Sequence, residues 1–147
     1  MTTISSETEF CESWRKVLRD GLLPLLSDDA VYAIYFALAN DRPDLVQGAC
    51  VSPPPMLANA DAECKAGCLF SYGQWKGMNL TTVGEVEEQF ARLCYDLDNR
   101  MGEPAASRWL ISFYDDTPRD EMIIALLPEF RAELERREAK ENEAEPS

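Results

Sequence analysis

The segment 82–102 constrains the fold more than any other part of the sequence, because it carries a complete set of signals for one long helix. Thr82 followed by Glu85 has the spacing of a capping box, in which each side chain bonds the backbone amide of the other residue. Apolar side chains then recur along one helical face: Val86, Phe90, Leu93, Leu97 and Met101. Gly102 readily adopts the left-handed conformation at which helices stop. The segment therefore predicts an amphipathic helix that must bury one face against other elements.

The C-terminal part of the chain carries the same kinds of helix signal. Thr117 is a good N-cap, Pro118 suits the first helical turn, and acidic residues follow near the positive end of the helix. An apolar stripe then runs along one face: Met122, Ile123, Leu126, Leu127, Phe130 and Leu134. We predict a helix over 118–136 with a kink near Pro128, followed by a flexible polar tail at 137–147.

The N-terminal residues predict a third amphipathic helix. Ser6 and Glu9 have capping-box spacing. Apolar residues follow at helical intervals: Phe10, Trp14, Val17 and Leu18. Proline lacks a backbone N–H and its ring clashes with the preceding turn, so we expect Gly21 and Pro24 to end or bend this helix.

A fourth helix is predicted directly afterwards, at 28–40. Ser27 is its expected N-cap, and two aspartates follow it near the positive helix end. The sequence AVYAIYFALAN is apolar almost all round, which predicts a central, buried helix. A buried strand over 31–36 is the alternative, because aromatic and β-branched residues also suit a sheet. The segment 104–114 leaves the same choice open, and we expect a helix there as well.

The middle of the chain, residues 41–80, shows no sustained period. Four prolines interrupt its first half, and the run at 53–55 favours a short polyproline segment. A short helix is expected from an N-cap at Asn59 to about Gly73. Gly73 and Gly77 would then flank a turn, since glycine is common in turns.

Together these signals predict a mainly α fold, a compact single-domain bundle of about four to six helices with a Pro-rich irregular middle segment. The globular domain is expected over 1–136 and the tail over 137–147. An α+β fold with a small sheet is the alternative, with strands near 30–36, 44–51 or 108–114.

The charge of the chain limits its partners. Lys and Arg total 14 against 27 Asp and Glu, so the net charge is −13. Such a chain repels phosphate backbones and anionic lipids, which argues against direct binding of nucleic acid or membranes. It favours a protein partner with a basic surface, although acidity that serves only solubility is an alternative explanation. The pattern does not indicate an oligomeric state.

The N-terminus and the cysteines predict a cytoplasmic protein. MTTISSETEF has neither the basic start nor the apolar core of a secretory signal, and no apolar run reaches the roughly 20 residues of a membrane span. The five cysteines are an odd number, which favours reduced thiols over a disulfide framework.

The residues available for chemistry argue against an enzyme. Histidine is absent, which removes the commonest general base and metal ligand. The glycines are scattered and form no phosphate-binding loop. Carboxylates do occur in pairs, but no pocket is evident that would separate their pKa values. We therefore expect no catalytic site and no cofactor.

The cysteines leave one further possibility. Cys64 and Cys68 are four residues apart and would share one face of a helix. With Cys50 and Cys94 they supply enough thiolates for a tetrahedral zinc site, but the usual Cys-x-x-Cys spacing is missing. Cysteine is also a small apolar residue that is often buried. We expect buried, reduced thiols and no metal.

A nearly neutral aromatic segment between acidic helices is the best candidate for a binding surface. Tyr, Trp and Met are enriched in the cores of protein interfaces, and charged residues are depleted there. The predicted binding residues comprise an aromatic turn, with Trp75 as its anchor, and carboxylates that steer the partner: Tyr72, Trp75, Lys76, Met78, Glu85, Glu87 and Glu88. The alternative is that Trp75 closes the hydrophobic core.

These features predict a non-enzymatic cytoplasmic protein-binding protein, of the inhibitor, immunity protein, chaperone or adaptor type, that engages a partner with a basic surface. One alternative is an acidic nucleic-acid mimic, whose carboxylates on the helices at 82–101 and 118–136 would block a nucleic-acid-binding enzyme. Another is a small thiolate metal-binding protein or enzyme built on the middle segment.

Overall fold

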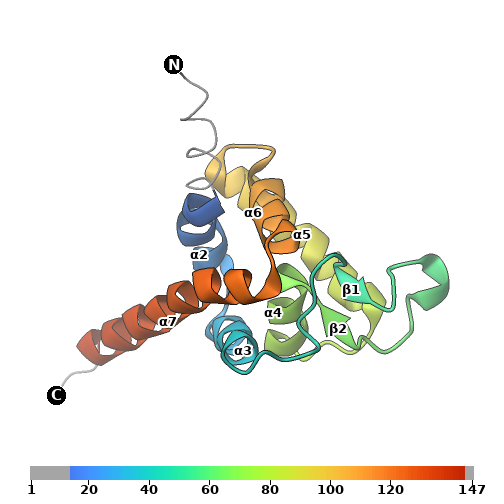
Figure 1. Ribbon diagram of the computed structural model, residues 1–147, viewed down its shortest axis with the longest axis horizontal. Coiled ribbons are helices and arrows are strands. Elements are labelled where there is room, and N and C mark those ends of the chain that lie inside the picture. The colour runs from blue at the N-terminus through green and yellow to red at the C-terminus, as the bar shows by residue number, and fades with distance from the viewer. Residues whose placement is uncertain (1–13, 145–147) are drawn as a thin grey trace.

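Helices dominate the computed structural model, which describes residues 14–144 (Figure 1). In chain order the helical elements are η1 (Val17–Leu22), α2 (Leu23–Leu25), α3 (Asp28–Ala39), η2 (Leu57–Asn59), α4 (Leu69–Gly77), α5 (Val83–Met101), α6 (Ala106–Asp116) and α7 (Arg119–Ala144). The strands β1 (Val51–Ser52) and β2 (Ala66–Gly67) form one antiparallel pair. The predicted mainly α bundle is confirmed.

The first described helix widens before its proline. The chain is helical from Trp14, and Val17–Leu22 forms a π-helix in which the N–H of Leu23 bonds to the carbonyl of Leu18, five residues earlier. The helix continues past Gly21 and Pro24 and ends at Leu26, whose backbone is extended. Gly21 does not stop the helix; it is buried, and a Cβ atom there would overlap the Leu97 side chain of α5. The predicted capping box at 6–9 lies outside the described residues.

Helix α3 begins at its predicted cap. The Ser27 hydroxyl accepts a hydrogen bond from the Ala30 amide at 3.1 Å, and Asp28 and Asp29 occupy the first turn. The helix is preferred over the alternative strand, but the expectation that it is buried all round is wrong. Helices α4 and α7 both contact α3, and the face that they leave uncovered exposes Tyr32 by 59% and Phe36 by 47%.

The middle segment differs most from the prediction. No helix begins at Asn59; residues 60–68 form turns and strand β2, and α4 starts only after Cys68. The predicted turn at Gly73–Gly77 is also wrong, because both glycines lie inside α4.

The glycines of α4 serve helix packing. A Cβ atom at Gly77 would lie 3.0 Å from the backbone of Ala30, and one at Gly73 would lie 2.7 Å from Cδ1 of Ile34. Both contacts are tighter than side chains normally allow, so α4 lies against α3 at a distance that glycine permits. The two residues act through a contact with a distant segment, and local turn propensity does not reveal it.

The second half agrees more closely with the sequence. Thr82 and Glu85 form the predicted capping box of α5, and Gly102 ends the helix with φ of 66°. Residues 106–116 are helical, as expected. Helix α7 begins at Arg119, one residue later than predicted, and runs through Pro128.

The predicted end of the last helix at Arg136 is wrong. Helix α7 continues to Ala144, and its final turns extend away from the rest of the molecule (Figure 1). Arg137 holds this part in place, because it donates to Asp28 at 2.8 Å, to the Leu23 carbonyl at 2.7 Å and to Glu133 at 2.6 Å. Helix α7 therefore continues past the predicted end, and Arg137 connects it there to α2 and α3.

Candidate protein-binding surface

The aromatic segment predicted as a binding turn lies largely in the core. Trp75 is only 9% exposed, and Tyr72 is buried with its ring 5.7 Å from that of Trp75 in a T-shaped arrangement. The surface seen by a partner here consists of Lys76 and Met78, which are exposed. Trp75 therefore does not lie on a prominent turn between two glycines, which was the basis for predicting it as an anchor.

Lys76 makes an internal contact in this segment. Its ammonium lies 3.9 Å from the centroid of the Trp75 ring and 3.6 Å from the Asp44 carboxylate. Burial and the nearby charge of Asp44 raise the pKa of Tyr72 to about 12, so its hydroxyl is neutral at physiological pH. These contacts fix α4 against the loop that carries Asp44.

The three predicted steering carboxylates have different environments. Glu85 accepts hydrogen bonds from the Thr82 and Thr81 amides. Both bonds lower the pKa of Glu85, and the bond from Thr82 has the larger effect. The main role of Glu85 is thus the capping of α5. Glu87 and Glu88 are exposed on the same helix, and Glu88 pairs with Arg92 at 3.7 Å.

Cys64 and Cys68 are buried as apolar residues would be. Cys64 and Cys68 do not share a helical face, because Cys64 precedes β2 and Cys68 caps α4. Their Sγ atoms donate to the Ala66 carbonyl and to the Ser71 hydroxyl, respectively. Across residues 14–144, no group of three or more His, Cys, Asp or Glu residues is arranged to hold a metal ion.

Burial keeps these thiols protonated, which gives a testable prediction. It raises the pKa of Cys68 to about 11 and, with a smaller contribution from Cys68, that of Cys94 to about 12. Because the thiolate is the nucleophile, only a small fraction of either residue is reactive at pH 8. We expect iodoacetamide to label both residues far more slowly in the native protein than in urea, as followed by peptide mass spectrometry. Equal labelling rates in the two states would contradict the burial of these thiols.

A second surface, which the sequence did not suggest, combines exposed aromatic rings with carboxylates. Tyr32 and Phe36 stack one turn apart on α3, with their ring centroids 6.4 Å apart. Beside them, α3 and α7 enclose a depression of about 390 Å³, which we call the α3–α7 groove. Its lining residues are Asp28, Asp29, Tyr32, Leu134, Arg137, Glu138 and Glu141.

The α3–α7 groove carries an excess of negative charge. Four carboxylates and one guanidinium line it, which gives a formal sum of −3. The guanidinium of Arg137 is already paired with Glu133 and Asp28. Asp29, Glu138 and Glu141 therefore face solvent next to an exposed aromatic pair, an arrangement that attracts a cationic side chain.

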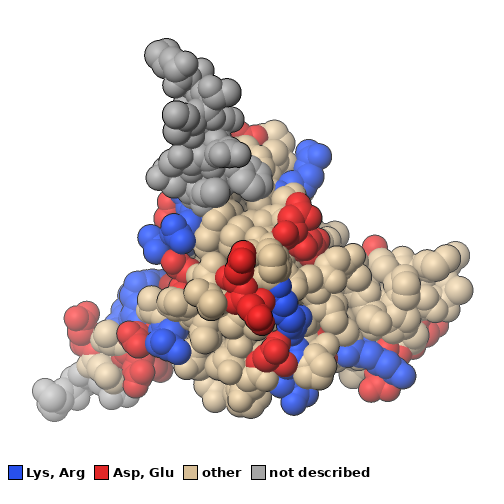
Figure 2. Space-filling view, viewed as in Figure 1, with Lys and Arg blue, Asp and Glu red and all other residues tan. Residues whose placement is uncertain are grey.

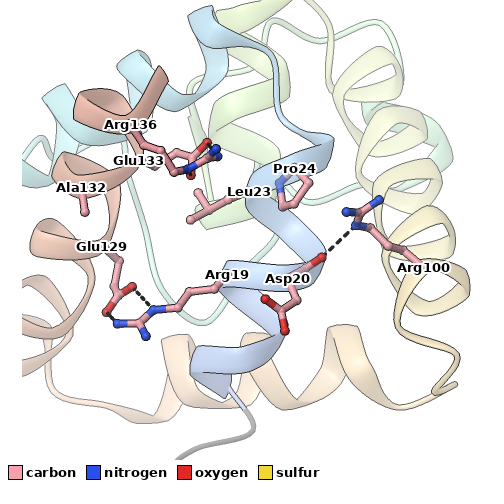
Figure 3. Close-up of a pocket in the computed structure, with 9 residues that line it drawn as sticks. All are labelled: Arg19, Asp20, Leu23, Pro24, Arg100, Glu129, Ala132, Glu133 and Arg136. Carbon is pink, nitrogen blue, oxygen red and sulfur yellow. Dashed lines mark hydrogen bonds and ion pairs between the residues drawn. The ribbon is translucent and has the colours of Figure 1, made fainter. Parts of the chain in front are cut away.

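A larger cavity of about 600 Å³ lies between η1, α2, α5 and α7 (Figure 3). Its polar groups bond to one another: Arg19 forms two hydrogen bonds with Glu129, at 2.7 and 2.8 Å, and Arg100 donates to the Asp20 carbonyl at 2.8 Å. Three guanidinium groups and three carboxylates line it, so it has no net charge. These bonds connect three helical elements, and the cavity is best explained as part of the scaffold.

Comparisons with known proteins do not assign the chain to a group: no family model, curated protein or solved structure matches it. Within residues 14–144, none of the helices has the length and apolar character needed to cross a bilayer.

Proposed function

We propose that this chain is a non-enzymatic protein-binding protein whose α3–α7 groove and neighbouring Tyr32–Phe36 pair engage a basic surface of a partner. One observation supports it above the others: two stacked aromatic side chains are exposed beside a groove with an excess of carboxylates. Adjacent exposed apolar side chains rimmed by polar residues are typical of an interaction site, and aromatic residues are common binding hot spots.

The chemistry of the surface indicates the kind of contact that it makes. The rings offer apolar area to the methylene groups of Lys and Arg, while Asp29, Glu138 and Glu141 pair with their charged ends. The net charge of −13 adds long-range attraction that speeds encounter with a cationic partner. A cytoplasmic inhibitor, immunity protein, chaperone or adaptor would use such a surface.

Nucleic-acid mimicry is less well supported. Glu135, Glu138 and Glu141 recur every three residues on α7 and are mostly exposed. Lys140 lies among them and Arg131 lies one turn before them, however, and both would repel the cationic groups that bind phosphates. An uninterrupted row of carboxylates would favour mimicry, and α7 does not provide one.

Affinity capture with matched variants tests the proposal. We expect the wild-type chain to capture basic proteins, and the captured amount is measured by quantitative mass spectrometry. A Tyr32→Ala, Phe36→Ala variant should capture at least about tenfold less of them. Tyr95→Ala is the control, because Tyr95 is an exposed aromatic on a different helix, α5. Equal capture by the groove variant and the control would overturn the proposal.

A further inference from the structure

An apolar loop projects from the opposite end of the molecule. Residues 53–60, PPPMLANA, carry no charge, and we call them the prong. Leu57 is 95% exposed and Met56 is also largely exposed. In Figure 1 the prong lies at the right, beyond β1 and β2, while the end of α7 lies at the left; in Figure 2 its outer end shows neither basic nor acidic atoms.

Hydrogen bonds hold the prong in one shape. The Asn59 side-chain amide donates to the Pro54 carbonyl at 2.9 Å, and the Met56 amide donates to the same carbonyl at 2.8 Å. At the base, the Gly84 amide of α5 donates to the Ala60 carbonyl at 3.0 Å. A Cβ atom at position 84 would lie 3.0 Å from that oxygen, so glycine allows this close approach.

A braced loop with an apolar tip is suited to insertion. Little backbone entropy remains to be lost when Met56 and Leu57 become buried, because these bonds already hold the backbone. A methionine beside a leucine presents adaptable aliphatic surface without hydrogen-bonding groups. The complementary surface is therefore a concave, aliphatic cleft.

Charges around the base restrict the partner further. Asp61 and Glu63 follow the prong and are exposed, as is Lys65, so residues 61–65 carry a formal charge of −1. Glu87 of α5 is also exposed, and it is near enough to Cys50 to add to the effect of burial in raising the pKa of that thiol. An anionic membrane would repel these carboxylates, whereas a protein cleft with Lys or Arg at its rim would attract them.

We propose that the prong inserts Met56 and Leu57 into an apolar, basic-rimmed cleft of a protein partner, as a contact separate from the α3–α7 groove. The prong proposal rests on the proposed function only in that the prong and the groove both require a protein partner. Its residues belong to a different segment, so the two surfaces can be removed independently.

Site-specific crosslinking in the full chain tests the prong. Benzoylphenylalanine at position 57 is expected to capture one protein from the lysate of the source cell; the same group at position 108, an exposed site on α6, is not. The captured protein is then purified and titrated against the wild type, Met56→Ser with Leu57→Ser, and Tyr32→Ala with Phe36→Ala. We expect the prong variant to bind at least about tenfold more weakly at unchanged thermal stability, since both side chains are exposed.

The remaining outcomes separate the two proposals. Capture that is equal at positions 57 and 108, capture of a second copy of this chain, or an affinity that the prong variant retains would each overturn the prong proposal. So would binding that is seen only with vesicles of phosphatidylcholine and phosphatidylserine. Loss of affinity in the Tyr32→Ala, Phe36→Ala variant alone would leave the groove as the binding surface and remove the prong.

Discussion

Trp75→Ala is expected to lower the free energy of unfolding by about 3–5 kcal/mol, as truncation of a buried aromatic residue does. Trp75 is 9% exposed, packs edge-on against Tyr72 and lies beneath the Lys76 ammonium. Its removal leaves a cavity where α4 meets the rest of the core. Urea denaturation followed by circular dichroism measures the loss.

Two further variants make the Trp75 result interpretable. Trp75→Phe retains most of the apolar volume and should lose less than Trp75→Ala, which gives a measurable value if the alanine variant fails to fold. Tyr95→Ala, at an exposed aromatic residue, should change stability by less than about 1 kcal/mol. A loss below about 1 kcal/mol for Trp75→Ala would instead restore its interpretation as an interface anchor.

Arg137→Ala is expected to destabilise the protein by about 2 kcal/mol, because a buried carboxylate loses one of its two charged partners. The Glu133 side chain is 6% exposed and is held by Arg136 and Arg137, while Arg137 also reaches Asp28 and the Leu23 carbonyl. Arg92→Ala is the matched control. Its partner Glu88 is also four residues away, but both side chains are exposed, so its loss should be below about 1 kcal/mol.

The pH dependence gives an independent check on the same pair. Burial alone would raise the pKa of Glu133, but hydrogen bonds from Arg136 and Arg137 outweigh it and lower the pKa below the usual 4.5. A carboxyl group whose pKa is lowered by folding stabilises the folded state at pH values above its unfolded-state pKa. This contribution is lost as the pH falls through the folded-state pKa. The stability difference between wild type and Arg137→Ala should therefore shrink in acid. A difference that is the same at pH 7 and pH 3 would contradict this role.

The sequence predicted elements whose signals are local. The caps at Ser27 and Thr82 and the stop at Gly102 are each read from a few adjacent residues, and the structure contains all three. At Gly73 and Gly77 the general preference of glycine for turns predicts the wrong structure, because here they allow contact with Ile34 and Ala30 of α3, which are 39 and 47 residues away in sequence. Where α7 continues past 136, it makes a contact that is also distant in sequence, that of Arg137 with Asp28.

The candidate surface was less accessible to sequence reasoning. In a helix as apolar as α3, the pattern does not show which side lacks a neighbour, so the exposure of Tyr32 and Phe36 depends on where α4 and α7 pack. Their spacing of four residues, one turn after Asp28 and Asp29, was a usable signal for an aromatic pair beside carboxylates. Glu138 and Glu141, which line the other side of the groove, fall within the predicted flexible tail. A prediction that leaves them out of the fold cannot place them beside α3.

The central claim, that the α3–α7 groove binds a basic amphipathic surface, is tested most directly by fluorescence anisotropy with a labelled helical peptide of Leu and Lys. We expect saturable binding that weakens with salt. The affinity should fall at least about tenfold in the Tyr32→Ala, Phe36→Ala variant and also in the Asp29→Asn, Glu138→Gln, Glu141→Gln variant. It should remain unchanged in Tyr95→Ala. The matched peptide of Leu and Glu should not bind. Equal binding of both peptides, or of the Lys peptide to all variants, would contradict it.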